Sequence, residues 1–265
     1  MTATATPLHA MPVPEPVPTV PAWTWINIFS RMLAIQGSWN YENLIGNGVG
    51  FCVEPALRKL PGGTHGAEFK AAMARESAYF NAHPYLASVA IGALVRAELS
   101  GVPAERIERF RTALAGPLGS VGDRLVWAGW LPFCSLVSLV AFGLGARPLA
   151  VIGLFLVLYN AGHLALRAWG LHVGWTRGLG VASALANPVL RGGPAHVARA
   201  AAAAAGVALP LTAAQVVSAG GSVVAVVLVA AALTAAVIVR FHGRVEGYKL
   251  ALVLIALFAL VSVAR

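Results

Sequence analysis

Residues 125–145 read LVWAGWLPFCSLVSLVAFGLG, a stretch of 21 residues without a charged side chain. At a rise of about 1.5 Å per residue, a helix of this length crosses the hydrocarbon core of a bilayer. A second such stretch, 148–166, follows closely, and 200–239 has no charged residue over 40 positions. These stretches predict a chain that crosses a membrane several times.

The composition favours the same class. Hydrophobic residues make up 58% of the chain and charged residues 11%, and the mean hydropathy is +0.75. Soluble domains are usually about 25% charged. The net charge of +9 does not predict a nucleic-acid partner, because the basic residues are dispersed between apolar stretches. We interpret them as orientation signals and as contacts to anionic membrane lipids. Cys52 and Cys134 lie in apolar surroundings, which favours space-filling thiols over a disulfide.

We therefore predict an all-α, polytopic membrane protein with about five transmembrane helices, re-entrant or broken segments and N-terminal amphipathic helices. Residues 1–22 are Pro-rich and predicted to be a disordered tail. Residues 23–122 mix short apolar stretches with charged helices and are predicted to be interfacial and re-entrant. An amphipathic helix from Trp25 to Gln36 is expected to lie on the membrane, while 46–53 and 85–95 are too short to span it. Residues 123–265 form the predicted transmembrane region.

Within that region the expected spans are 125–145, 148–166, two within 200–239 separated by a turn at 218–222, and 248–264. Residues 168–190 are expected to form a packed re-entrant or surface helix, with Gly170, Gly174 and Gly178 as a small-residue face. Arg167 and the later basic loops are assigned to the cytoplasmic side, which predicts a C-terminus outside the cell.

Three polar clusters interrupt the apolar background. The first is Gln36-Gly37-Ser38-Trp39-Asn40-Tyr41-Glu42. Its amides, indole N–H and carboxylate can hydrogen-bond several hydroxyl groups, and a flat aromatic face suits the C–H side of a sugar ring. The alternative is an interfacial anchor whose polar atoms face lipid headgroups. The candidate binding residues here are Gln36, Trp39, Asn40 and Glu42.

The second cluster is Tyr79-Phe80-Asn81-Ala82-His83-Pro84. Because Pro84 disfavours helix at His83, Asn81 and His83 are expected at a helix end. Asn81 is a candidate binding residue, and a simple helix stop is the alternative.

The third cluster surrounds Asp123, the only aspartate of the chain, which follows Gly116-Pro117-Leu118 and Gly122. A carboxylate and a Gly/Pro break at the mouth of a span are typical of transporter sites. The alternative is that Asp123 caps a helix that begins at Arg124.

Other chemistry is not indicated. Gly46-Asn47-Gly48-Val49-Gly50 lacks the preceding strand of a dinucleotide loop, and no P-loop occurs. The histidines show no ligand spacing with cysteine or acidic residues, so no metal or other cofactor is expected. His163 lies in a predicted span, where a helix–helix hydrogen bond is favoured over a role as phosphate carrier.

Taken together, these motifs resemble the IID membrane component of the mannose/fructose/sorbose family of sugar phosphotransferase systems. The resemblance extends from Arg31 to about Gly180. It rests on residues 36–42, Pro55-Ala56-Leu57-Arg58-Lys59-Leu60, Phe80-Asn81 with Pro84, Gly116-Pro117-Leu118 with Gly122-Asp123, and Asn160, Arg167, Gly170 and Gly174.

The resemblance implies a subunit of the bacterial inner membrane that joins a IIC subunit, in a larger hetero-oligomer, to form the translocation pathway for a mannose-type hexose. It implies that soluble IIB and IIA components carry the phosphate and that this chain has no phosphorylation site of its own. The chain departs from the family pattern at Asn43-Leu44-Ile45, Glu76-Ser77-Ala78 and Glu98-Leu99. These departures keep a second hypothesis open, that of a non-transporting scaffold or regulatory paralogue.

Overall fold

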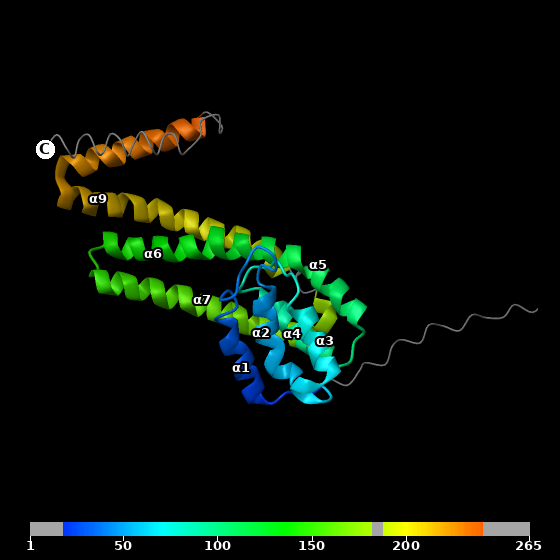
Figure 1. Cartoon of the computed structure of the whole chain (residues 1–265). Helices are drawn as coiled ribbons and strands as arrows, with labels where there is room; N and C mark the ends of the chain where they lie inside the picture. The colour runs from blue at the N-terminus through cyan, green and yellow to red at the C-terminus, as the bar shows by residue number, and fades with distance from the viewer. Residues whose placement is uncertain (1–17, 182–187, 241–265) are drawn as a thin grey trace, which may run out of the picture. The chain divides into compact units, whose positions relative to one another are not determined.

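The structure, a computed structural model, describes residues 18–181 and 188–240 (Figure 1). Over these ranges it is helical, and its strand-like pairing consists of two isolated bridges, Asn40 with Leu44 and Leu44 with Phe80. The predicted all-α class is confirmed. The elements are α1 (Ala22–Met32), α2 (Gly46–Leu57), η1 (Gly63–His65), α3 (Ala67–Glu76), α4 (Ala87–Leu99), α5 (Ala104–Gly122), the π-helix η2 (Asp123–Trp130), α6 (Leu131–Gly143), α7 (Pro148–Arg177), η3 (Gly178–Val181) and α9 (Pro188–Arg240).

The chain forms two compact units. Within the described residues, unit 1 comprises 18–129, 160–181 and 188–196, and unit 2 comprises 130–159 and 197–240. These ranges differ from the three regions expected from composition. The predicted tail up to Val17, the span 248–264 and the C-terminus lie outside the described residues.

Unit 1 has a dense core built around α4. Nearly every side chain of α4 is buried, and α2, α5 and η3 pack against it. The uncharged stretches 46–53 and 85–95 are therefore apolar because they fill the interior of this unit. Whether they also enter a bilayer stays a prediction.

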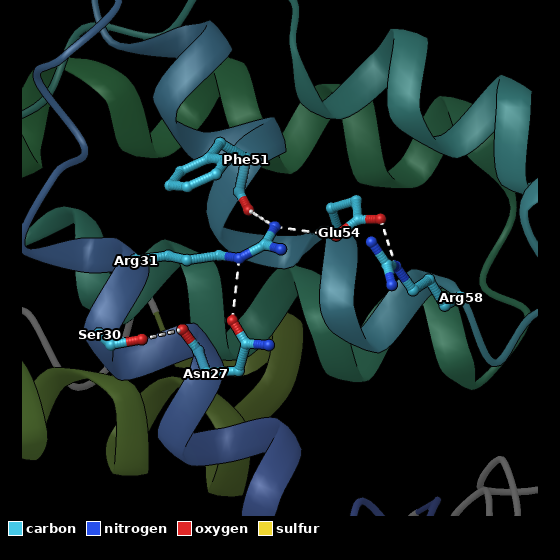
Figure 2. Close-up of polar contacts among 6 residues, drawn as sticks. All are labelled: Asn27, Ser30, Arg31, Phe51, Glu54 and Arg58. Atoms are coloured by element: carbon cyan, nitrogen blue, oxygen red, sulfur yellow. Dashed lines mark hydrogen bonds and ion pairs between the residues drawn. The ribbon is translucent and has the colours of Figure 1, made fainter.

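Helix α1 contributes to the same core, in which Ile28 and Met32 are fully buried, while Trp23 and Ile26 are exposed. A polar cluster fixes α1 to α2 (Figure 2). The Arg31 guanidinium donates to Asn27 Oδ1 at 2.9 Å, to the Phe51 carbonyl at 2.8 Å and to the Glu54 carboxylate at 2.8 Å. This cluster holds the end of α1, and thereby the start of the loop that carries residues 36–42.

The small-residue face of α7 packs closely against α4, as predicted. A Cβ added at Gly174 would overlap the Val89 carbonyl, and one added at Gly92 would overlap the Leu171 carbonyl. The two backbones are therefore in direct contact, an arrangement that side chains at these positions would prevent.

The packed helix predicted for 168–190 is present over its described part, but it is not separate from the preceding span, and whether it is re-entrant stays a prediction. Residues 168–177 continue α7 without a break, and η3 extends them to Val181. Arg167 lies inside this helix and is buried, so it is not the loop charge that the orientation argument assumed. A run of small residues against α4 keeps the helix packed past the end of its apolar stretch.

The break predicted before Asp123 is also absent. Pro117 lies within α5, and α5, η2 and α6 form one continuous helix from Ala104 to Gly143. Proline removes one intrahelical hydrogen bond, and packing of Leu118 and Gly122 in the core of unit 1 holds the helix together across this point.

Unit 2 consists of α6, the first part of α7 and most of the described part of α9. Thr212 Oγ1 donates to the Leu139 carbonyl at 3.3 Å and Gln215 Nε2 to the Gly143 carbonyl at 3.4 Å, which joins α9 to α6. Residues 218–222 lie within α9 where a turn was predicted, although the ribbon of α9 does change direction along its length (Figure 1).

Three helices in the described residues are long and apolar enough to cross a membrane: Ala104–Gly143, Pro148–Val181 and Gly192–Val216. The first two contain the predicted spans 125–145 (up to its last two residues) and 148–166. The total number of crossings and their orientation stay predictions.

Candidate functional site

The first polar cluster forms a tight loop after α1, and Asn40 shapes it. Asn40 Oδ1 accepts from the backbone N–H groups of Glu42 at 3.0 Å and Asn43 at 2.9 Å. The Leu44 N–H donates to the Asn40 carbonyl at 2.9 Å, and Leu44 takes a positive φ of 50°. Asn40 therefore acts as a local turn former, through side-chain bonds that mimic a backbone turn.

This loop is joined to the second cluster through the backbone. The Ile45 N–H donates to the Phe80 carbonyl at 3.2 Å, and the Phe80 N–H donates to the Asn43 carbonyl at 3.2 Å. Residues 40–45 and 80–81 are thus fixed side by side, although they are far apart in sequence.

The second cluster in turn packs against α5. A Cβ at Gly122 would overlap the side chain of His83, and one at Gly119 would just contact Asn81 and Ala82. Since Gly122 directly precedes Asp123, the third cluster lies next to the second. The structure therefore brings all three predicted segments together in unit 1.

The predicted binding side chains are mostly open to the surroundings. Gln36, Trp39, Glu42, Asn81 and Asp123 are exposed and Asn40 is half-buried. The rings of Trp39 and Tyr41 contact edge to face, with centroids 4.8 Å apart. Within the described residues, Asn40, Asn81 and Asp123 share no side-chain hydrogen bond. The segments meet, and the exposed side chains remain open to another molecule, whereas the Asn40 side chain is engaged in the bonds that shape its own loop.

Asp123 is not a helix cap. It has helical dihedrals, φ −61° and ψ −43°, whereas a cap residue has extended ones. It begins the π-helical segment η2 instead. π-Helical turns are rare and frequently occur at functional sites. Because the helix continues through Asp123, its exposed carboxylate does not cap a helix that begins at Arg124.

A cluster of rings behind the second motif was not predicted. Tyr85 stacks on His163 with centroids 5.0 Å apart, and His83 lies 5.0 Å from Trp127. Arg167 lies over the Tyr85 ring at 4.6 Å and donates to the carbonyls of Met32 and Pro84. The buried Arg167 thereby fixes the peptide after Pro84 to the end of α1.

His163 contacts Asn160 at 2.9 Å between Nε2 and Oδ1, one turn away on α7. His163 thus makes a hydrogen bond within its own helix, and its ring stacks on Tyr85, which is also in unit 1.

Buried charges beneath the second cluster were also missed. Arg111 on α5 pairs with Glu76 at 2.5 Å and donates to the Ala78 carbonyl at 2.8 Å. Arg75 binds both oxygens of Glu98, at 2.9 and 2.8 Å. Burial, partly opposed by Arg111, raises the pKa of Glu76 to about 8. The sequence held one signal for this network, since Glu76 lies on the face of α3 that carries Phe69 and Met73.

An open apolar groove of about 500 Å³ lies elsewhere on unit 1, between α1 and α7. Trp25, Phe29, Leu33, Leu171 and Trp175 line most of it. None of the predicted binding residues lies in this groove, and its apolar lining does not suit a sugar. In the part of the chain that the structure describes, no group of three His, Cys, Asp or Glu side chains could hold a metal ion.

Comparison with known proteins gives a consistent result. Residues 20–192 match the family model described as "PTS system mannose/fructose/sorbose family IID component". The chain is 32% identical over 161 residues to the mannose-specific EIID component of Escherichia coli K12, covering 58% of this chain and 55% of the relative. It is 31% identical over 168 residues to the fructose permease IID component of Bacillus subtilis, covering 61% and 59%. The matches thus span between one half and two thirds of these relatives.

Two solved structures share the fold. One is a cryo-EM structure of the mannose transporter ManYZ in complex with microcin E492, with a TM-score of 0.55 and 27% identity over 75% of this chain and 70% of that one. The other, described as a membrane protein, has a TM-score of 0.61 and 26% identity over 70% and 69%. Together with the family match over more than half of its length, these similarities show that the chain belongs to the mannose/fructose/sorbose family of phosphotransferase-system IID components.

Proposed function

We propose that this chain is the IID-type subunit of a phosphoenolpyruvate-dependent sugar transport system in the bacterial inner membrane. It joins a IIC subunit to form the translocation pathway for a mannose-type hexose, and soluble IIB and IIA components carry the phosphate. The observation that carries this proposal is the convergence of residues 40–45, 80–84 and 119–123 on one part of unit 1.

The pairing with IIC is supported by apolar surface. On α7, Leu149, Ile152 and Val157 are more than half exposed, as is Leu209 on α9. Side chains of this kind are covered in the cell by lipid or by another membrane subunit. We expect a IIC partner to cover part of them and to be needed for a stable, monodisperse preparation.

The sugar is proposed to meet the polar side chains Gln36, Trp39, Asn40, Glu42, Asn81 and Asp123, of which Asn40 is half-buried and the others are exposed. Neutral hydroxyl groups are held well by amides and carboxylates, and hydrogen bonds to a charged group contribute about 1.5–3 kcal/mol. Asp123 and Glu42 are the strongest acceptors in this set, because both are exposed carboxylates whose side chains make no hydrogen bond within the described residues.

The decisive experiment measures phosphoenolpyruvate-dependent uptake of mannose, fructose and sorbose in cells with and without this gene. Loss of uptake of one hexose on deletion supports the proposal. Unchanged uptake, with the chain still found in a complex with a IIC subunit, would favour the non-transporting scaffold that the motif departures keep open.

Two variants test whether Asp123 binds sugar or only supports the helix. Asp123→Asn and Asp123→Ala are both expected to assemble normally, since the residue caps no helix, and to lower hexose affinity about tenfold. Glu105→Gln, a matched change of an exposed acid on α5, should leave affinity unchanged. Normal transport by Asp123→Ala would remove this residue from the site.

A further inference from the structure

His83 carries a buried hydrogen-bond donor that residues 18–181 and 188–240 do not use. His83 is 1% exposed, and its side chain packs against Gly122 on α5. Its Nδ1 accepts from the Tyr85 N–H at 3.2 Å. An imidazole that accepts at Nδ1 carries its proton on Nε2 when neutral. Within the described residues, Nε2 has no hydrogen-bond partner.

The ring is neutral at physiological pH. Burial, together with the nearby charge of Arg167, lowers the pKa of His83 to about 4. His83 therefore presents one N–H donor and no positive charge. A buried donor without an acceptor costs about 1–3 kcal/mol, so this position requires an acceptor that the described chain does not supply.

The neighbour of this donor is an aromatic ring that reaches the surface. Trp127 lies in the π-helix η2, its ring centroid is 5.0 Å from that of His83, and the two planes are tilted by 54°. Trp127 is 41% exposed. A partly exposed indole thus lies beside an imidazole whose Nε2–H has no acceptor within the described residues.

We propose that His83 Nε2–H and the exposed ring of Trp127 form a subsite for an unphosphorylated hexose. The indole ring contacts the C–H face of the sugar, and the imidazole donates to one hydroxyl oxygen. A neutral acceptor is favoured because a neutral imidazole offers a single hydrogen bond and no charge to a phosphate. This inference rests on the proposed function and adds two residues to the candidate site, next to Asp123 through Gly122 and η2.

Two substitutions of His83 separate its two nitrogens. Asn places an amide near the position of Nδ1, so His83→Asn keeps an acceptor for the Tyr85 N–H and loses the donor. Gln reaches the position of Nε2, so His83→Gln keeps the donor. The full chain is purified with its IIC partner, and binding is measured for mannose, fructose, sorbose and the monodeoxy derivatives of whichever hexose binds best.

In the unsubstituted complex, we expect removal of one particular hydroxyl to weaken binding about three- to tenfold, the range for one neutral hydrogen bond. In His83→Asn the parent hexose binds that much more weakly, and the difference between it and this deoxy derivative disappears. His83→Gln retains most of the difference. Trp127→Ala weakens the parent hexose and all the derivatives alike.

If His83→Asn binds every sugar as the unsubstituted complex does, a water or a ring face satisfies Nε2–H and the inference is wrong, while the proposed function stands. If no hexose binds the unsubstituted complex, the proposed function and this inference both fail. Should neither His83 variant assemble, the surface variant Trp127→Phe decides. A hexose-induced change in tryptophan fluorescence that is lost in Trp127→Phe supports the subsite, and an unaltered change excludes it.

Discussion

Unit 1 and unit 2 are both apolar, but they place their apolar side chains differently. In unit 1, side chains such as Leu94 and Ile107 are completely buried within the chain, and buried arginine–glutamate pairs are enclosed with them. In unit 2, large apolar side chains such as Leu149 and Leu209 are exposed. Unit 1 therefore has an interior of its own, whereas unit 2 depends on lipid or on a partner subunit for burial.

This difference explains where the polar motifs lie. All segments that carry the resemblance to the family, from Gln36 to Asp123 and from Asn160 to Gly174, belong to unit 1. A substrate site needs side chains held in fixed positions, and only a packed interior supplies that support. The comparison predicts that substitutions in unit 1 have large effects on folding and that equivalent ones in unit 2 have small effects.

The largest effect is expected for Arg111→Met. This change leaves the buried Glu76 carboxyl without its partner and removes the bond to the Ala78 carbonyl. Breaking a buried ion pair typically costs about 3–5 kcal/mol. We expect this loss in denaturant titrations in detergent above pH 8, where Glu76 of the unsubstituted protein is mostly ionised. A double variant, Glu76→Leu with Arg111→Met, should recover much of it, and equal losses in the single and double variants would contradict the pairing.

The next effect tests the contact between α4 and α7. Gly92→Ala places a methyl group against the Leu171 carbonyl, and overpacking of this kind costs about 1–3 kcal/mol. Gly153 is the matched control, because it lies in the unit 2 part of α7 and an added Cβ would meet nothing within 4 Å. Gly153→Ala should be neutral or stabilising by up to about 1 kcal/mol. Equal melting temperatures of the two variants would show that α7 does not pack on α4.

A smaller effect concerns pH. The pKa of Glu76 is raised to about 8, so between the ordinary carboxyl value and pH 8 the folded state holds a proton that the unfolded state has lost. Stability is therefore highest below the ordinary value and falls as pH rises toward 8, by at most about 1.4 kcal/mol per pH unit. The lowered pKa of His83 acts in the opposite direction, between about 6.5 and 4.

The window from pH 6.5 to 8 thus isolates Glu76. Thermal unfolding in that window should show stability decreasing with pH, and Glu76→Gln should flatten the slope. A slope that is the same in both proteins would mean that Glu76 is ionised throughout.

The sequence was sufficient for features that depend on local pattern. The absence of charge predicted the long helices of residues 125–145 and 148–166, and the spacing of Gly170 and Gly174 predicted close helix packing. The continuity of the helix through Pro117 was missed, because the packing of Leu118 and Gly122 outweighs the local preference of proline for a break.

The parts of the site that were missed depend on contacts between distant segments. Arg111 and Glu76 are 35 positions apart, and no local sequence pattern predicts their pairing. Arg167 was interpreted as a loop charge, since nothing near it in sequence shows that it reaches the carbonyl of Met32. The signals that could have helped were indirect. Glu76 lies on an apolar helix face, and position 122 is a glycine, which leaves room for the side chain of His83.

The smallest effect is expected at the surface of unit 2. Leu149 is 81% exposed, so Leu149→Ala removes contacts with the surroundings and leaves the chain's own packing intact. Surface substitutions of this kind usually change stability by less than about 0.5 kcal/mol. The same substitution at Leu94, which is 0% exposed, should cost about 2–5 kcal/mol, because it leaves a cavity in the core of unit 1.

The stability of both variants is measured for the chain with and without its IIC partner. If Leu149→Ala is silent alone but weakens recovery of the complex, the exposed face of α7 is covered by the partner. If it is silent in both, lipid covers this face. A loss at Leu149 as large as that at Leu94 would show that unit 2 has an interior of its own, and would end the distinction between the two units.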